Sequence, residues 1–252
     1  MPTALVRPPG TSFAAALTAQ QPRPIIDVEL ARQQHRAYCQ VLRTAGLKLI
    51  ELPAEEAYPD SCFVQDTAVI FGDWAILSRP GAESRRGEVD SVSRALQGQK
   101  RLARIEAPGT LEGGDVLVIG SRVYVGLSAR TNPAGFVQLR DLLEPQGATV
   151  EAAPVSEVLH LLTGCTYLGQ GVLLATDPLL DAPFCRGLDV VRVPPEEAYA
   201  ANGLGVGRVA LLPDGCPQTA AAVQARGFQV LTVSLSEFAK ADGGITCLSL
   251  LL

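Results

Sequence analysis

Cys247 is the residue whose setting in this chain most suggests covalent chemistry. It follows Gly243 and Gly244 and precedes the closing apolar run from Leu248 to Leu252. Two glycines let the backbone approach a ligand, and a thiol at the start of a strand stays reachable, as a nucleophile must. Free cysteines are also among the most buried residue types and most are inert, so a packing role is the alternative.

A histidine and a glutamate are candidates to assist this thiol. His160 lies in the apolar run 158–162, which we interpret as a strand, where a hydrogen-bonded core histidine is the commoner finding. The only other histidine, His35, is predicted on the solvated face of a helix, so His160 is the candidate proton carrier. Glu112 precedes two glycines and could be a turn residue, but a carboxylate beside a histidine fixes its tautomer and stabilises the imidazolium.

Three further charged residues suit a small charged ligand. Asp66 precedes an apolar β run and could cap that strand, but a carboxylate also matches the fork of a guanidinium. Arg85 and Arg130 each follow a predicted hairpin, at the same place in consecutive repeats. Most surface arginines are solvated, yet two in equivalent positions could together hold a substrate carboxylate.

The elements that must position these residues form a repeating unit of two β runs joined by a tight turn, a helical stretch and a further strand. The predicted hairpins are 68–77, 116–125, 166–175 and 203–212. The predicted helices are 85–97, 132–143, 177–185 and 217–226, and the strands that follow them are 102–106, 148–153, 188–193 and 228–233. The end segments 4–7 and 245–252, with a helix at 27–45 and a strand at 47–52, would make a fifth copy across the termini.

A repeat of this length predicts an α/β fold, a five-bladed pseudo-symmetric α/β propeller of ββαβ units, as one domain over residues 1–252. Pairing of the first and last strands would close the ring without free edges. An open α/β sheet is the alternative, but doubly wound sheets alternate single strands with helices. In a propeller the positions before each hairpin converge on the central axis, so Asp60, Asp66, Glu112, His160 and Cys247 are predicted to share one pocket.

Composition narrows the class of protein. The chain has 252 residues, a formal charge of −5 and six cysteines without a CxxC pair, which indicates a cytoplasmic protein with reduced thiols and no zinc site. The acidic balance argues against a nucleic-acid partner, and neither a signal peptide nor a membrane span is predicted. A small-molecule partner is expected, and assembly as a homodimer stays open.

Six stretches carry a family resemblance: FVQDTAV at 63–69, RPGAESRR at 79–86, LEGGD at 111–115, SARTN at 128–132, LHL at 159–161 and GGITCLS at 243–249. They resemble the dimethylarginine dimethylaminohydrolases, members of the guanidine-modifying superfamily with a five-bladed α/β propeller. The resemblance runs from about residue 4 to the C-terminus in the family's order.

The resemblance implies hydrolysis of Nω-methylated arginine to citrulline and dimethylamine or methylamine, through a covalent thiouronium and with no metal or organic cofactor. Cys247 is then the nucleophile, His160 the general acid and base, and Glu112 the residue that orients it. The implied substrate contacts are Asp66 for the guanidinium, Asp60 for the amino acid end, Arg85 and Arg130 for the α-carboxylate, and Leu17 in a lid.

One residue departs from the family pattern. Gln65, also an expected substrate contact, stands where the family typically has a second acid before the aspartate. A neutral amide can still accept a hydrogen bond, but it supplies no charge against a guanidinium. Gln65 therefore leaves the preferred methylation state open and keeps an arginine deiminase, or another guanidino-compound hydrolase, as the alternative activity. A non-catalytic propeller that only binds its partner is the second alternative, although it would have no reason to keep this set of facing residues.

Overall fold

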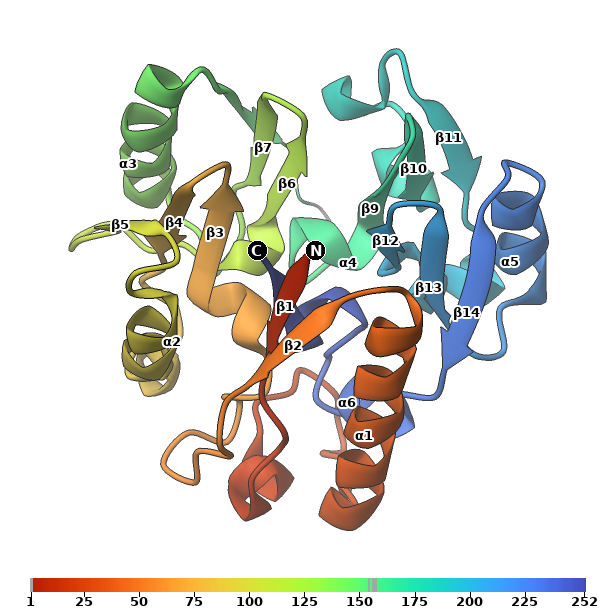
Figure 1. The fold of residues 1–252 in the computed structure, drawn as a ribbon, viewed down its shortest axis with the longest axis horizontal. Coiled ribbons are helices and arrows are strands. Elements are labelled where there is room, and N and C mark those ends of the chain that lie inside the picture. The colour runs from red at the N-terminus through yellow and green to blue at the C-terminus, as the bar shows by residue number, and fades with distance from the viewer. Residues whose placement is uncertain (1, 154, 156–157) are drawn as a thin grey trace.

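The computed structural model describes residues 2–153, 155 and 158–252, and within them the strands form five sheets of three. In each sheet the first two strands pair antiparallel and the third runs parallel to the second. The sheets surround a common centre (Figure 1), so the predicted propeller of five ββαβ-like units is confirmed.

Four units are each formed by three strands that are consecutive in sequence, and the fifth combines strands from the two ends of the chain. Their strands are β3 (Ala68–Phe71), β4 (Trp74–Leu77) and β5 (Arg101–Arg104); β6 (Val116–Ile119), β7 (Arg122–Gly126) and β8 (Thr149–Ala153); β9 (Cys165–Gly169), β10 (Val172–Ala175) and β11 (Asp189–Arg192); β12 (Leu204–Val206), β13 (Val209–Pro213) and β14 (Gln229–Val233); and β15 (Ser249–Leu251), β1 (Thr3–Val6) and β2 (Lys48–Glu51).

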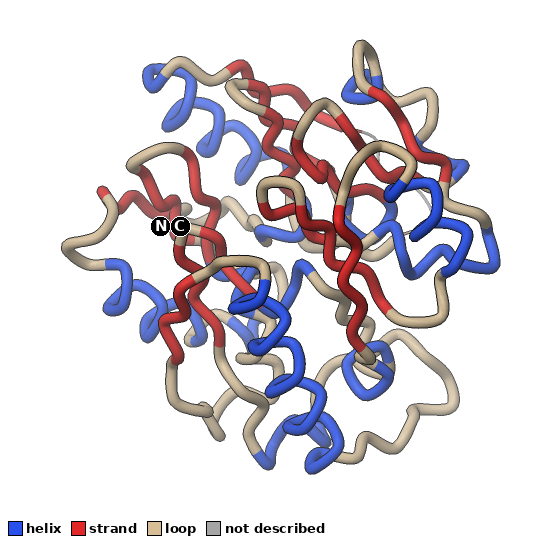
Figure 2. The backbone as a smooth tube through the Cα atoms, turned by 45° about the vertical axis from the view of Figure 1, so that its right-hand side comes forward, coloured by secondary structure: helices blue, strands red, loops and turns tan. Residues whose placement is uncertain are grey.

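The ring closes through the chain ends, as predicted. The N-terminal strand β1 pairs antiparallel with the C-terminal strand β15, with Ala4 opposite Leu251, and parallel with β2. Figures 1 and 2 both draw the two termini side by side. The last strand is shorter than predicted because residues 246–248 form a 3₁₀ turn before it, and this turn carries Cys247.

The longer helices lie on the outer rim and cover the sheets from outside (Figure 1). They are α1 (Val28–Thr44), α2 (Glu88–Leu96), α3 (Pro133–Leu143) and α5 (Pro217–Gln224), and two single-turn helices are α4 (Leu161–Gly164) and α6 (Ser236–Ala239). In α2, Val89, Val92 and Leu96 recur on one face and pack against Ala75 and Leu77 of β4. Each unit thus buries an apolar layer between its sheet and its outer segment, which leaves the inner ends of the strands for the site.

Two predicted helices differ from the observed ones. The stretch 177–185 is not one helix but two 3₁₀ turns, Asp177–Leu179 and Pro183–Cys185, because Pro178 and Pro183 cannot donate the helical hydrogen bonds. The helix predicted from residue 85 begins at Glu88, since Arg85 belongs to a separate 3₁₀ turn.

The prediction of a solvated His35 is wrong. His35 is 3% exposed and lies on the inner face of α1, together with Ala31, Tyr38 and Leu42. These positions follow the helical period, so the apolar residues at 31, 38 and 42 place the histidine on the buried face despite its polar sequence neighbours. Among the described residues, no helix has the length and apolar character needed to cross a membrane.

Candidate active site

The site residues occupy the same place in four units, the short turn before each unit's first strand. Asp66 lies in the turn before β3, Glu112 directly before the turn that leads into β6, His160 before α4 and β9, and Cys247 in the turn before β15. His160 was predicted inside a strand, but it is the N-cap residue of α4, and its backbone N–H donates to Oγ1 of Thr163. The repeat therefore brings together residues that are far apart in the sequence.

These turns surround a cavity of about 210 Å³ at the centre of the molecule. Seven predicted site residues line it, namely Leu17, Asp60, Asp66, Arg85, Arg130, His160 and Cys247. Glu112 lies behind this lining and is fully buried, in contact with the imidazole. Gln65 lies elsewhere.

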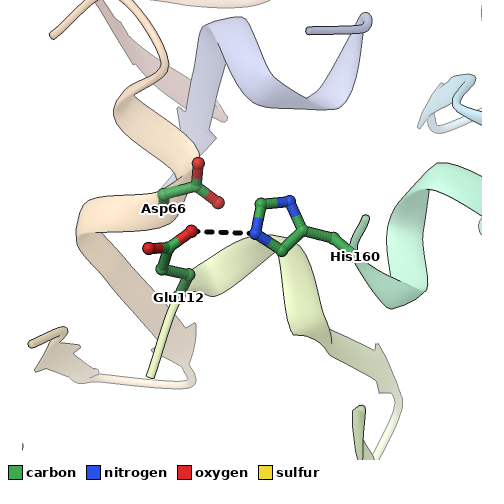
Figure 3. A group of neighbouring side chains, drawn as sticks. All are labelled: Asp66, Glu112 and His160. Carbon is green, nitrogen blue, oxygen red and sulfur yellow. Dashed lines mark hydrogen bonds and ion pairs between the residues drawn. The ribbon is translucent and has the colours of Figure 1, made fainter. Parts of the chain in front are cut away.

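His160 and Glu112 form a buried pair. Nε2 of His160 lies 2.8 Å from Oε2 of Glu112 (Figure 3). Burial alone would lower the pKa of His160, but the negative charge of Asp66, the hydrogen bond to Glu112 and the charge of Asp115 outweigh it and raise the pKa to about 9. Burial acts to raise the pKa of Glu112, but its hydrogen bond to His160 and the charge of Arg85 hold it below the usual range. At neutral pH the pair is an imidazolium held by a carboxylate.

Two glycines after Glu112 are required for this close packing. A Cβ on Gly113 would lie 2.1 Å from the carbonyl oxygen of Gln65, and one on Gly114 would lie 3.0 Å from the imidazole and 2.8 Å from Asp66. The backbone N–H of Gly114 donates to Oδ1 of Asp66 at 2.9 Å. The glycines therefore let the Glu112 segment lie against the acid and the histidine at once.

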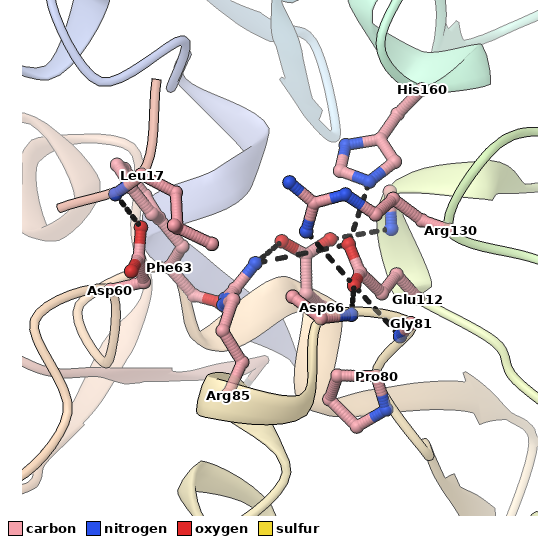
Figure 4. Close-up of polar contacts among 12 residues, drawn as sticks. Leu17, Asp60, Phe63, Asp66, Pro80, Gly81, Arg85, Glu112, Arg130 and His160 are labelled. Atoms are coloured by element: carbon pink, nitrogen blue, oxygen red, sulfur yellow. Dashed lines mark hydrogen bonds and ion pairs between the residues drawn. The ribbon is translucent and has the colours of Figure 1, made fainter. Parts of the chain in front are cut away.

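Asp66 is held by an arginine from the following turn. Nη1 of Arg85 donates to Oδ2 of Asp66 at 2.8 Å, and its Nη2 donates to the carbonyl of Phe63 (Figure 4). Its Nε and Nη2 also donate to the Glu88 carboxylate. Arg85 and both acids are nearly excluded from solvent, so each charge depends on its partner. Arg85 thus lines the cavity, but most of its N–H donors are already hydrogen-bonded to protein acceptors.

Cys247 also lines the cavity and is half-buried. The backbone N–H of Gly244 donates to its Sγ at 3.4 Å. Burial and the nearby negative charge of Asp66 raise the pKa of the thiol to about 11, although the Gly244 bond, the Thr246 side chain and Arg85 act to lower it. The resting thiol is protonated, and its pKa depends on the charge balance in the cavity.

An N-terminal segment, residues 17–19, forms part of the cavity wall. The backbone N–H of Leu17 donates to Oδ1 of Asp60 at 3.0 Å, and that of Ala19 donates to Oδ2 of Asp242 at 2.6 Å. Leu17 is 38% exposed although it lines the cavity, so its side chain lies between the cavity and solvent. Burial raises the pKa of Asp60, with Arg85 acting in the opposite direction.

Arg130 is the more available of the two arginines. Its Nη1 lies 3.3 Å from Oε1 of Glu112, and its side chain is 21% exposed against 5% for Arg85. No backbone carbonyl or second acid binds it among the described residues. Arg130 can therefore bind a substrate anion without leaving the buried Glu112 carboxylate unpaired, because His160 also binds that carboxylate.

One cluster has the spacing of a metal site. Asp66, Glu112 and His160 each offer a ligand atom, and these atoms lie within 4.8 Å of one another (Figure 3). The Asp66 oxygens already accept hydrogen bonds from Arg85 and Gly114, and Glu112 is shared by His160 and Arg130. These partners balance the carboxylate charge with protein cations, so the donor set does not need a metal ion.

Gln65 is not where its predicted role requires. It lines a second cavity, on the side of the ring bounded by Val116, Thr166 and Leu251, rather than the one that holds Cys247. Its Oε1 is buried without a hydrogen-bond partner among the described residues. The position of Gln65 therefore gives no support to a direct contact with substrate, because Gln65 and Asp66 line different cavities.

Two buried residues without an assigned role join the site segments. Asp115 accepts hydrogen bonds from α4 and from the loop of Arg130, and Asn202 bonds to α4 and to the turn of Cys247. Asn202 stands before β12, so it fills in the fourth unit the place that the other four units give to Asp66, Glu112, His160 and Cys247. The repeat could have indicated this position, since Asn202 directly precedes the predicted hairpin at 203.

Comparison with known proteins agrees with this geometry. Residues 14–176 match the family model for eukaryotic N,N dimethylarginine dimethylhydrolase. The chain belongs to the dimethylarginine dimethylaminohydrolase family. It is 38% identical over 249 residues to the N(G),N(G)-dimethylarginine dimethylaminohydrolase of Pseudomonas aeruginosa, covering 98% of this chain and 97% of that one. The corresponding protein of Streptomyces coelicolor is 42% identical over 252 residues, with 98% and 95% covered.

Solved structures of this family are also similar over the whole chain. A dimethylarginine dimethylaminohydrolase variant bound as an adduct to S-methyl-L-thiocitrulline superimposes with a TM-score of 0.97 at 37% identity and covers 100% of both chains. A variant of the Pseudomonas aeruginosa enzyme in complex with citrulline gives 0.96 at 37% identity, with 99% and 98% covered. The N-terminal domain of an arginine dihydrolase, ArgZ, is similar in fold, with a TM-score of 0.88 at 19% identity.

Proposed function

We propose that this protein hydrolyses Nω-methylated arginine, as asymmetric dimethylarginine or monomethylarginine, to citrulline and dimethylamine or methylamine. One observation carries the proposal: a single cavity is lined by the Cys247 thiol, the His160 imidazole and the Asp66 carboxylate. A thiol, a proton carrier and an acid suited to a guanidinium are the three groups that this reaction needs. The family relatives and the citrulline complex of one of them support the same substrate class.

The charges in the cavity explain how a protonated thiol would react. The pKa of Cys247 is raised to about 11 by burial and by the charge of Asp66. A guanidinium bound to Asp66 would neutralise that charge and add a positive one beside the sulfur, and both effects lower the thiol pKa. The substrate itself would therefore help to form the thiolate that attacks its central carbon, and the thiol proton would leave to solvent because His160 is already protonated.

His160 would supply the next proton. Its pKa of about 9 keeps it protonated at neutral pH, so it can protonate the departing amine as the carbon–nitrogen bond breaks and the thiouronium on Cys247 is left. The neutral imidazole would then take a proton from water, which attacks the same carbon and releases citrulline with a free thiol. Glu112 would hold the imidazole during both steps. We propose that no metal or cofactor takes part, because side chains supply the nucleophile and the proton carrier.

The substrate's amino acid end would face the opposite part of the cavity. We assign the α-carboxylate mainly to Arg130, because Arg85 is already bound by Asp66 and Glu88 and contributes chiefly its charge. Asp60 would bind the amino group, and Leu17 would cover the bound substrate from the N-terminal segment. A cytoplasmic location and a homodimeric state remain predictions of the sequence.

An assay of the released amine tests the proposal. The protein is offered asymmetric dimethylarginine, monomethylarginine or arginine separately, and the amine released from each is identified. We expect dimethylamine and methylamine from the first two and little ammonia from the third. Cys247→Ser should reduce turnover by at least about 10⁴-fold, because a hydroxyl is far less acidic than a thiol. Cys216→Ser, at a half-buried thiol outside the cavity, is the matched control and should turn over normally. Ammonia from arginine as the main product would favour the deiminase instead.

A further inference from the structure

The helix that carries the proton carrier is too short to hold its own position. α4 is a single turn of four residues, Leu161–Gly164, with His160 as its N-cap. One turn of helix is not stable by itself, because nucleation fixes several residues for a single hydrogen bond. The orientation of His160 must therefore come from contacts between α4 and the rest of the protein.

Asp115 makes the contact on the Glu112 side. Its Oδ1 accepts the backbone N–H of Leu161 at 3.1 Å, one residue after His160. Its Oδ2 accepts the hydroxyls of Ser128 at 2.6 Å and Thr131 at 2.7 Å. The carboxylate is fully buried, and each of its hydrogen bonds is to a segment bearing a site residue.

The two hydroxyls extend this contact to Arg130 and Glu112. Ser128 Oγ accepts the backbone N–H of Arg130 at 3.0 Å, and Thr131 Oγ1 accepts that of Glu112 at 3.1 Å. One buried carboxylate thus links the backbones that present the imidazole, its carboxylate partner and the cavity's available arginine.

Asn202 makes the contact on the Cys247 side. Its Nδ2 donates to the carbonyl of Leu162 at 2.8 Å and to Oγ1 of Thr246 at 2.9 Å, and its Oδ1 accepts the backbone N–H of Thr246 at 2.8 Å. The amide therefore joins α4 to the turn that carries the thiol. Gly244 permits this approach, since a Cβ there would lie 2.4 Å from Oδ1 of Asn202.

We infer that Asp115 and Asn202 are positioning residues that hold α4 from two sides, so that the His160 imidazole meets Glu112 and lines the cavity that the Cys247 thiol also lines. Neither lines the catalytic cavity, and each acts through residues that do. The catalytic part of the inference rests on the proposed function, but the geometry applies to any reaction that uses His160 with Cys247.

Asp115→Asn tests the Glu112 side. The amide has the size of the carboxylate but lacks its charge, and its nitrogen cannot accept the two hydroxyls. We expect kcat to fall by about 10- to 100-fold with KM within about threefold, since a small displacement of a catalytic group costs this much. The matched control is Glu197→Gln: Glu197 is 5% exposed and accepts the backbone N–H groups of Gln218 and Thr219 and the Thr219 hydroxyl at the start of α5, away from the cavity.

Titration of the histidine C2–H signals by NMR measures the pKa of His160. A residue that only stabilises the fold would not change this pKa. The titratable and charged groups around the imidazole are Asp66, Glu112, Asp115, Arg85, Arg130 and Cys247. Loss of the Asp115 charge should lower the pKa of His160, whereas Glu197→Gln should leave it unchanged. This measurement needs no substrate, so it stands apart from a failure of the proposed function.

Asn202→Leu tests the Cys247 side with a side chain of similar length. We expect a fall in kcat of about 10-fold or more with an unchanged His160 pKa, because no charge is removed. If Asp115→Asn does not fold, Thr131→Val removes one donor to the carboxylate and should lower kcat in the same direction. The inference is overturned if these variants lose activity only in proportion to unfolded protein, as the Glu197→Gln control does, or if Asp115→Asn leaves the His160 pKa unchanged.

Discussion

The two histidines of this chain are buried to nearly the same extent and differ in almost everything else. His35 is 3% exposed and His160 is 7% exposed. Burial and the charge of Arg36 lower the pKa of His35 to about 4, and its Nδ1 lies 3.6 Å from the Cys39 thiol. Carboxylates surround His160 and raise its pKa to about 9. Burial therefore does not decide what a histidine can do; the charges buried with it do.

The largest expected effect separates the two histidines by activity. His160→Gln should lower kcat for dimethylarginine by about 10²- to 10⁴-fold, the usual loss when a general acid and base is removed. His35→Gln should keep kcat within about twofold, since that residue lies outside the catalytic cavity. Steady-state kinetics of both purified variants, corrected for folded fraction by circular dichroism, make the comparison. Equal losses in both would break it.

A smaller effect should follow from removing the charge that distinguishes His160. Glu112→Gln keeps a hydrogen-bonding group near Nε2 but not its negative charge, so the pKa of His160 should fall from about 9. We expect kcat to fall roughly 10- to 100-fold at neutral pH, because less imidazolium is present to protonate the amine. The pH profile of kcat measures it, and the limb assigned to His160 should move to lower pH. An unmoved limb would mean that Glu112 does not set this pKa.

The third effect concerns stability rather than activity and belongs to His35. Its pKa is about 4 in the folded protein and about 6.5 in the unfolded chain, so the unfolded state binds the proton more readily. The stability due to neutral His35 is present above pH 6.5 and is lost as the pH falls through about 4, up to about 3 kcal/mol.

Denaturant unfolding between pH 7 and pH 4 checks this expectation. His35→Gln should flatten the loss of stability towards acid, because glutamine binds no proton in this range. A curve as steep as that of the unsubstituted protein would show that His35 is not the group that titrates.

The sequence predicted the arrangement of the five units better than it predicted the local conformation at individual site residues. Hairpin turns and helical periods predicted five repeats, and the repeat correctly placed Asp66, His160 and Cys247 around one cavity. The sequence also paired His160 with Glu112, 48 residues away, and the structure brings the two side chains into contact. It did not predict the local conformation of His160, since the run of apolar residues indicated a strand where the histidine is the N-cap of α4.

The positions of individual side chains were harder to predict for the same reason. Gln65 is next to Asp66 in sequence but lines another cavity, and a local pattern does not reveal which way a turn points each side chain. Asp115 was not assigned because its hydrogen bonds to the Ser128 and Thr131 hydroxyls and to the Leu161 backbone depend on how distant segments pack. Asn202 occupies an equivalent place in the repeat, so its position could be found from the sequence, whereas its hydrogen bonds to Leu162 and Thr246 require the coordinates.

Trapping the intermediate tests the central claim most directly. The protein would be mixed with dimethylarginine, quenched in acid during turnover, digested and analysed by mass spectrometry. The account predicts a covalent adduct on the peptide that contains Cys247 and none on the peptides of the five other cysteines, which serve as internal controls. Citrulline formed at full rate without any adduct on Cys247, or with the adduct on another cysteine, would contradict it.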